Sequence, residues 1–213
     1  AFIAGAGPSL EDNIEKIQKN RNKFVLFAVN KAVKYLQQNG VTPDFTVCLD
    51  SSNMKETLGD IGNSIQRMNC IMDLKTDSAL FEMPFKNIFI NFSDKDCVTK
   101  KLSEINEFVK FYETGGTASS FALVSAVKMG FSQIIMAGVD LAFKDDVIYT
   151  SGELINRISA NEILVNSEKK ELVKVKSVTG SMVTTRTDYE AFIHHFNRLI
   201  SKFENVDIYN LTT

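Results

Sequence analysis

Two glycine-containing turns in the sequence have the composition of anion-binding loops. The first, Gly5-Ala6-Gly7-Pro8-Ser9, follows a short apolar run and precedes a segment with helical spacing. In a parallel α/β sheet such a turn exposes backbone N–H groups and the positive end of a helix dipole, and both attract a phosphate. The G-x-G-x-x-G pattern is incomplete, because Leu10 stands at the third glycine position and no Walker lysine follows. For Gly5, Gly7 and Ser9 a structural tight turn and a phosphate loop therefore both stay open.

The second turn repeats this composition in the middle of the chain. Gly115 and Gly116 precede Thr117 and Ser119 at the expected start of a helix. Either hydroxyl can serve as a helix cap, which is the structural interpretation, or can donate to an anionic ligand. Two turns of this kind in one chain favour a shared ligand, although capping explains each of them separately.

Polar residues also follow three of the expected strands at the point where each strand ends. Asn30 follows the apolar run 24–29, Asp50 follows 45–49, and Gly138 with Asp140 follows 134–137. The carboxyl ends of parallel strands share one edge of the sheet, where ligands bind in such folds. We therefore expect these side chains to meet in one crevice, with turn capping as the alternative for Asp140.

Other chemical candidates are weaker. Asp94 and Asp96 have the D-x-D spacing that can hold a divalent cation, but their place before a helix favours N-capping. His194 and His195 flank the apolar stripe of the last expected helix, which favours surface or boundary roles. The sequence predicts no metal site and no Ser-His-Asp arrangement.

Short apolar runs alternate with segments of helical spacing along the chain. Most of the runs are continuously apolar, which indicates strands covered on both faces. They are Phe2 to Ala4, Phe24 to Val29, Phe45 to Leu49, Cys70 to Met72, Ile88 to Ile90, Ile134 to Ala137 and Val206 to Tyr209. The expected helices are Ser9 to Asn20, Lys31 to Asn39, Asp96 to Phe111, Thr117 to Met129, and one with apolar spacing from Tyr189 to Phe203.

This alternation predicts an α/β fold with a doubly wound, mostly parallel sheet. Residues 144–185 break the rhythm, because 172–178 alternates with period two and Thr179-Gly180-Ser181 can turn a hairpin. We expect that region to be a small lid or hairpin insertion. Thr187 and Glu190, three residues apart, predict a capping box for the last helix.

Composition limits the classes of partner. A chain of 213 residues with 44% hydrophobic residues is sufficient for one domain, which we expect to span 1–213. The net charge of −2 gives no footprint for nucleic acid or an anionic membrane, and no apolar run approaches the roughly 20 residues of a membrane span. Three dispersed cysteines favour a reducing cytoplasm. Because an apolar strand starts at the first residue, we expect a fragment of a longer protein.

Six segments together resemble one known family. They are IAGAGPSL, AVNKAVKYL, TPDFTVCLD, TGGTASSFALVSAVKMGFSQIIMAGVDLAF, VTGSMVTTRTDYEAFIHHF and VDIYNLT. Their order and spacing resemble the core domain of the motility accessory factor family of bacterial flagellin glycosylation proteins. That domain is shared with an archaeal 6-hydroxymethyl-7,8-dihydropterin pyrophosphokinase and is similar in layout to bacterial sialyltransferases that use CMP-activated nonulosonic acids.

The resemblance implies a Rossmann-like glycosyltransferase of sialyltransferase type that moves a nonulosonic sugar from a CMP-activated donor to Ser or Thr hydroxyls of flagellin. No cofactor is implied. The motif positions expected around the nucleotide are Gly5, Gly7, Ser9, Asn30, Asp50, Thr117, Gly138, Asp140 and Tyr149. The chain departs from the sialyltransferases at Ala6 and Asp50, where they have Asn, and it has no histidine in 178–184, where they have a catalytic one.

Departure of CMP needs stabilisation of a phosphate, which backbone amides at the two glycine turns can supply. On this hypothesis Asp140 is the base for the acceptor hydroxyl or orients the ribose, and Tyr149 donates to the phosphate. Two alternatives stay open. One is transfer of pyrophosphate from ATP to a hydroxymethyl pterin, with Mg²⁺ held by carboxylates such as Asp50 and Asp140. The other is a non-catalytic module for flagellin handling.

Overall fold

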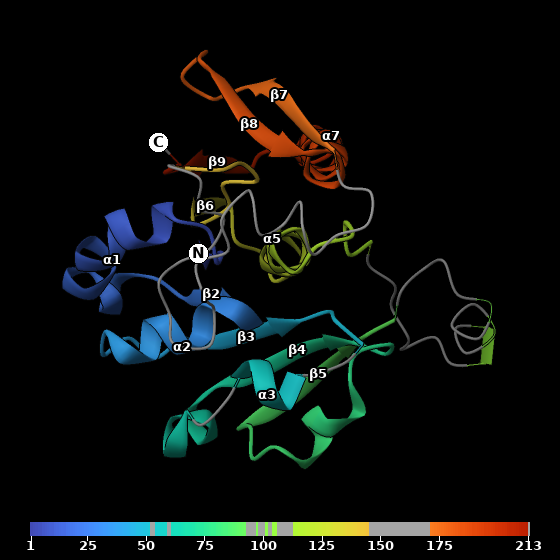
Figure 1. The fold of residues 1–213 in the computed structure, drawn as a ribbon. Coiled ribbons are helices and arrows are strands. Elements are labelled where there is room, and N and C mark those ends of the chain that lie inside the picture. Colours follow the sequence, from blue (N-terminus) through green and yellow to red (C-terminus); the bar gives the residue numbers. More distant parts are fainter. Residues whose placement is uncertain are drawn as a thin grey trace.

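A parallel sheet of seven strands organises the molecule. The computed structural model describes residues 1–51, 54–58, 61–92, 97, 101, 104–105, 113–144 and 171–212. The strand order is β5-β4-β3-β2-β1-β6-β9, and every neighbouring pair is parallel. The strands are β1 (Phe2–Ala4), β2 (Leu26–Val29), β3 (Phe45–Cys48), β4 (Asn69–Asp73), β5 (Asn87–Asn91), β6 (Gln133–Ala137) and β9 (Asp207–Asn210). Figure 1 shows the sheet running from β9 near the top to β5 at the bottom. The expected Rossmann-like, doubly wound fold is confirmed.

Helices cover both faces of this sheet. They are α1 (Ser9–Lys19), α2 (Asn30–Gln38), α3 (Met54–Leu58), α5 (Ala118–Lys128) and α7 (Thr187–Ile200), with short 3-10 turns η1 (Arg21–Lys23), η2 (Gly62–Arg67) and η3 (Ser78–Glu82). Successive side chains of β1 serve opposite faces, as the period of a strand requires. Phe2 and Ala4 belong to the core under α1, α2 and α3, whereas Ile3 belongs to the core under α5 and α7. None of the described helices is long and apolar enough to cross a membrane.

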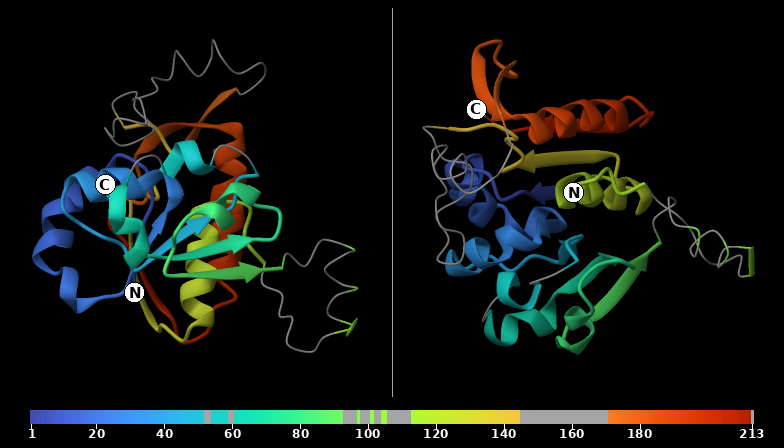
Figure 2. Two further views of the ribbon diagram at one scale, coloured as in Figure 1. Left: turned by 90° about the horizontal axis from the view of Figure 1, so that it is seen from below. Right: turned by 45° about the vertical axis from the view of Figure 1, so that its right-hand side comes forward.

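The expected insertion contains a two-stranded antiparallel sheet. Strands β7 (Leu172–Lys176) and β8 (Met182–Arg186) pair with Val175 opposite Val183. Gly180, with a φ of +90°, lies in the turn between them, and its amide donates to Ser177. Figure 2 shows this hairpin standing beside α7 at the β9 end of the molecule. Residues 145–170 of the expected lid lie outside the described residues, as does most of the expected helix Asp96 to Phe111.

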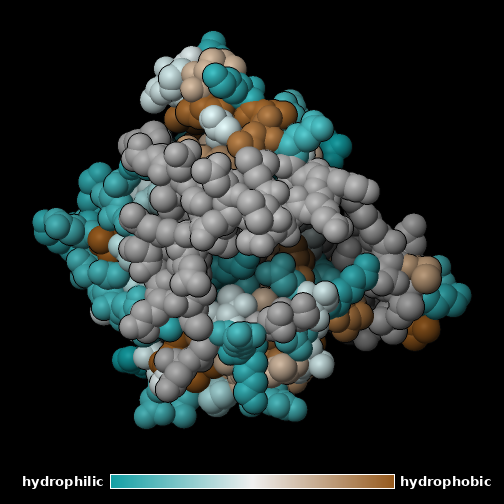
Figure 3. All heavy atoms as spheres, viewed as in Figure 1, coloured by the Kyte–Doolittle hydropathy of each residue, from teal (hydrophilic) through white to brown (hydrophobic). Residues whose placement is uncertain are grey.

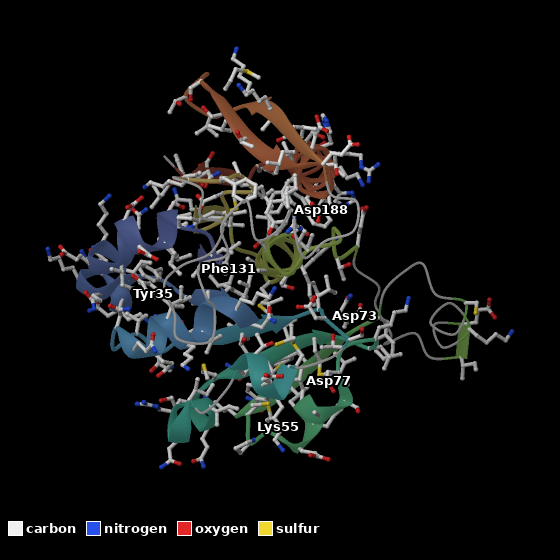
Figure 4. The ribbon with its side chains drawn as sticks, in the orientation of Figure 1. Tyr35, Lys55, Asp73, Asp77, Phe131 and Asp188 are labelled. Atoms are coloured by element: carbon white, nitrogen blue, oxygen red, sulfur yellow. The ribbon has the colours of Figure 1, made fainter. Side chains whose placement is uncertain are left out.

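The start of α7 differs from the sequence prediction. The helix begins at Thr187, and Arg186 is its N-cap residue with no side-chain capping bond. The predicted Thr187–Glu190 capping box is therefore wrong. Asp188 acts in the first turn instead, because its Oδ1 accepts hydrogen bonds from the Arg186 guanidinium and from the Tyr189 amide. In Figure 4, Asp188 lies where α7 begins.

Candidate functional site

A cavity of about 270 Å³ lies at the carboxyl edge of the sheet, where β1 and β6 adjoin. We call it the strand-end cavity. The chain leaves β1 toward β2 on one side, whereas β6 lies on the other side of β1, so this is the topological switch point of the fold. Eight of the predicted site residues line the cavity: Gly7, Asn30, Asp50, Gly116, Thr117, Ser119, Gly138 and Asp140. The structure thus brings together most of a set that is dispersed along the sequence.

The glycines of the first turn allow two loops to approach closely. A Cβ atom added to Gly5 would lie 2.1 Å from the Gly138 carbonyl oxygen, and one added to Gly7 would lie 2.1 Å from Asp140 Oδ2. The Gly5 amide donates to Ala137 O at 2.8 Å, and the Gly7 amide donates to Gly138 O at 2.7 Å. Both amides are therefore used inside the protein. The predicted role of these two amides as phosphate donors is wrong, and the alternative of a structural turn accounts for them.

Ser9 joins the same two loops from the first turn of α1. It is buried, its amide donates to Asp140 Oδ2 at 2.9 Å, and its hydroxyl accepts from the Gly138 amide at 2.9 Å. Ser9 does not line the cavity, and its amide is likewise unavailable to a phosphate. Its observed role is to orient the carboxylate of Asp140.

Asp140 lines the strand-end cavity and has a carboxyl group whose pKa is shifted by its surroundings. Burial raises the pKa of its carboxyl group, while the hydrogen bond from the Ser9 amide and the charge of Lys144 oppose that rise. Its Oδ1 atom is buried and has no hydrogen-bond partner among the described residues. A carboxylate with a raised pKa and a free oxygen has the properties of a proton acceptor.

The second glycine turn forms the opposite wall. Gly115 and Gly116 have φ values of +76° and +80°, and Thr117 is the N-cap of α5, accepting from the Ser120 amide at 3.0 Å. The capping interpretation is therefore confirmed for Thr117. Gly115 does not line the cavity, because it lies against Ser120, whose Oγ would be 2.4 Å from an added Cβ.

Two amides of this turn remain available. Ala118 and Ser119 both line the strand-end cavity, and neither amide has an acceptor in the described part of the chain. They occupy the first turn of an 11-residue helix, where amides have no intrahelical partner and the helix dipole is positive. This wall is therefore the part of the cavity with the strongest preference for an anion.

Asn30 and Asp50 form the third wall, at the ends of β2 and β3. Asn30 is 2% exposed, and its Nδ2 lies 3.4 Å from Asp50 Oδ2. Farther along the same edge, Asp77 caps η3 and accepts from the Met54 amide, whereas Asp73 binds Asn91. Figure 4 shows Asp73 and Asp77 toward β4 and α3, apart from Asp188. These two acids therefore have structural partners and do not line the cavity.

Sequence reasoning missed the wall that α7 contributes. Arg186, Tyr189 and Phe192 line the strand-end cavity, as does Lys31. The Arg186 Nε donates to Asp188 Oδ1 at 2.8 Å, a second guanidinium nitrogen pairs with Oδ2, and Cζ lies 4.4 Å from the Tyr189 ring centroid. Tyr189 and Phe192 belong to an apolar stripe that reads as core in the sequence. The available signal was the arginine directly before that stripe.

Ion pairs connect Glu113, in the loop before α5, to α7 and to Lys202 just after it. Glu113 Oε2 accepts from Lys202 at 2.9 Å, and this bond lowers the pKa of Glu113. His195 Nε2 lies 3.5 Å from Glu113 Oε1, so this histidine has the expected boundary role outside the cavity. Tyr149 lies outside the described residues. Within the described ranges, no three or more His, Cys, Asp or Glu side chains gather in a metal-binding group.

The sheet order and the cavity at its switch point define a Rossmann-like α/β domain. A family model described as "6-hydroxymethylpterin diphosphokinase MptE-like" matches residues 1–146, and the chain belongs to this MptE-like family. The expected relationship to the domain shared by motility accessory factors and the pterin pyrophosphokinase is confirmed.

A solved structure has the same fold. The MAf glycosyltransferase from Magnetospirillum magneticum AMB-1 superposes with a TM-score of 0.79 at 20% identity, covering 99% of this chain and 31% of that chain. This chain thus spans less than a third of that glycosyltransferase. An uncharacterized protein of Treponema pallidum (strain Nichols) is 44% identical over 50 residues, which are 24% of each chain.

Proposed function

We propose that this domain binds the donor nucleotide of a glycosyltransferase, which moves a nonulosonic sugar from a CMP-activated donor to Ser or Thr hydroxyls of flagellin. The observation that carries the proposal is the convergence of four strand ends and the starts of α5 and α7 on one cavity. The fold shared with the MAf glycosyltransferase supports the reaction class. Donor and acceptor identities come from the resemblance in sequence.

The walls of the strand-end cavity suggest where each part of the nucleotide binds. The phosphate lies against the Ala118 and Ser119 amides, with the Arg186 guanidinium beside it, because these groups supply positive potential without a metal. The aromatic rings of Tyr189 and Phe192 provide a stacking surface for the base. Negative charge that develops on the leaving phosphate is stabilised by the same amides.

Asp140 acts as the base for the acceptor hydroxyl in this proposal. Its unpartnered Oδ1 and raised pKa fit a proton acceptor, and the Ser9 amide holds its other oxygen. By the same hypothesis Tyr149 donates to the phosphate. Asp140→Asn should abolish transfer and leave CMP binding intact, whereas unchanged transfer would refute the base assignment.

A second function is favoured by the description of the family model, which names a 6-hydroxymethylpterin diphosphokinase. It is transfer of pyrophosphate from ATP to 6-hydroxymethyl-7,8-dihydropterin, for which Mg²⁺ would be bound by Asp50 and Asp140. Both carboxylates line the strand-end cavity, so oxygen ligands of the type that Mg²⁺ prefers are present. When bound, the ion would neutralise charge on the transferred phosphates.

A thermal-shift panel distinguishes these functions. CMP, CDP, ATP, UDP and GDP are each tested with and without Mg²⁺. A ligand at about 100 times its Kd adds about 2.7 kcal/mol to the free energy of unfolding, which corresponds to a rise in Tm of about 5–11 °C for a chain of this size. A rise with CMP alone, independent of Mg²⁺, supports glycosyl transfer. A strict requirement for ATP with Mg²⁺ supports the pyrophosphokinase, and no rise with any nucleotide supports a non-catalytic module.

A further inference from the structure

A second cavity adjoins the strand-end cavity. Its volume is about 320 Å³, and it lies between the β7–β8 hairpin, α7, β6 and β9. We call it the hairpin cavity. Its interior is apolar, formed by the cross-strand pair Val175 and Val183 together with Ile193, Phe196 and Ile200 of α7. Apolar surface gathers around the hairpin and α7 at the top of Figure 3. Volume and lining match those of ligand pockets, which are mostly apolar with a few polar groups.

The two cavities share one wall. Val139, Asp140 and Leu141 line both of them. The hairpin holds this wall in place, because the Thr185 hydroxyl donates to Leu141 O at 2.5 Å and the Phe143 amide donates to Thr184 O at 2.9 Å. Leu141 has a φ of +50°, a strained conformation for a residue other than glycine. The fold therefore retains a strained backbone conformation next to Asp140, the residue that lies between the strand-end cavity and the hairpin cavity.

Polar groups line the hairpin cavity at two places, Asp140 at the shared wall and a set of exposed side chains at the mouth. Asn197, Asn210 and Lys176 line it and are exposed. The Asn197 carboxamide carries both a donor and an acceptor, as a peptide group does, whereas Asn210 Oδ1 accepts from Thr212 and leaves Nδ2 of Asn210 as a donor. The mouth therefore suits a peptide backbone, whereas the interior suits an uncharged apolar side chain.

We propose that the hairpin cavity is the acceptor site, which takes an apolar side chain of a peptide while the neighbouring Ser or Thr hydroxyl reaches Asp140 at the shared wall. This inference rests on the proposed glycosyl transfer and adds where the acceptor binds and what it must contain. The nucleotide and the acceptor thus approach Asp140 from opposite sides.

The geometry gives a balanced transfer step. The acceptor hydroxyl oxygen forms a bond to the anomeric carbon of the sugar, and its proton passes to the Asp140 carboxylate. The bond between the anomeric carbon and the phosphate oxygen breaks, and its electron pair leaves with the nucleotide. Asp140 Oδ2 stays hydrogen-bonded to the Ser9 amide throughout.

The test compares two dipeptide probes with the whole chain. Acetyl-Ser-Phe-amide and acetyl-Ser-Ala-amide differ only in the apolar side chain, and their affinities are measured by saturation-transfer NMR titration with and without saturating CMP. We expect the Phe probe to bind at least about tenfold more tightly, because its ring enters the cavity. CMP should not displace it. Equal affinities, no binding of either probe, or displacement by CMP would overturn the proposal.

Two matched hairpin variants locate the bound probe. Val178 lines the hairpin cavity and is 70% exposed, whereas Met182 is 61% exposed and is not part of the lining. Val178→Asp should weaken binding of the Phe probe about tenfold, because the new carboxylate lies beside an apolar ligand. Met182→Asp should change binding by no more than about twofold. Equal effects of the two substitutions would contradict the assignment.

The nucleotide panel separates this inference from the proposed function. A Phe probe that binds as expected to a protein that binds no nucleotide would leave the peptide site standing and remove the glycosyl transfer on which its acceptor role rests. CMP binding with no difference between the probes would leave the proposed glycosyl transfer standing and remove the peptide site.

Discussion

The loop after β1 lies directly against the loop after β6 at Gly5, so Gly5→Ala tests whether the two loops approach this closely. The added Cβ would lie 2.1 Å from Gly138 O and 2.6 Å from Gly138 C. Ordinary contact begins at 3.4 Å, so the two backbones would have to separate by about 1.3 Å. No side-chain rotation relieves this clash, because the obstacle is backbone. The φ of Gly5 is not positive, so the cost is entirely steric.

Overpacking of a well-packed site costs about 1–3 kcal/mol, and a backbone obstacle puts Gly5→Ala at about 3 kcal/mol. For a chain of this length that cost lowers Tm by about 6–12 °C. The shift should also move Gly138 and its neighbour Asp140, so CMP affinity should fall with stability. Thermal unfolding followed by circular dichroism, and CMP titration at 15 °C below Tm of each variant, measure both effects.

Gly40→Ala is the matched control. Gly40 has a φ of +69° and nothing within 4 Å of an added Cβ, so this substitution costs only backbone strain, about 1–2 kcal/mol. It should lower Tm by less than Gly5→Ala does and leave CMP affinity unchanged. If Gly5→Ala is no less stable than Gly40→Ala, the close approach of the β1 and β6 loops is refuted.

Three further predictions concern the walls of the strand-end cavity. Burial raises the pKa of Asp140 above its value in the unfolded chain, so the contribution of this group to stability is present below about pH 4 and is lost as the pH rises through the folded pKa. Asp140→Asn should therefore gain stability relative to the parent chain between pH 4 and pH 7, measured by urea unfolding. A difference in stability that does not change with pH would refute this. Arg186→Met removes the positive charge beside the phosphate, so CMP affinity should fall about tenfold with a weaker salt dependence in titration calorimetry. Asp188→Asn removes the carboxylate that orients the Arg186 guanidinium, so it should also lower CMP affinity; an unchanged affinity in either variant contradicts the phosphate assignment. Thr117→Ala removes the cap of α5 and should lower Tm by about 2–4 °C, whereas Thr117→Ser should retain most of the stability.

Strand positions were predictable from the sequence because burial on both faces makes a strand apolar throughout. The run Phe2 to Ala4 became the fully buried strand β1, and Phe45 to Leu49 became β3 with one residue fewer. The expected cover on both faces does not extend to β6, in which Ile135 is exposed. The antiparallel hairpin was likewise visible in the period-two alternation around residues 172–178. The local sequence pattern is sufficient to locate these strands, because the hydrophobicity of the residues within each strand reflects how that strand is covered.

The start of α7 could not be predicted in the same way. Thr187 and Glu190 have the spacing of a capping box, but Asp188 binds both Arg186 and the Tyr189 amide and so organises the first turn instead. A pair of residues with suitable spacing does not reveal which neighbour will compete for the same amides.

The sequence by itself determined that polar residues follow buried parallel strands, and therefore that Asn30, Asp50 and Asp140 meet at one edge. Chain topology alone requires this, because parallel strands end on the same side. Only the tertiary structure decided what Gly5 and Gly7 accommodate. A glycine shows that something approaches the backbone closely, and here the approaching group is the neighbouring loop at Gly138 and Asp140, which uses both glycine amides internally.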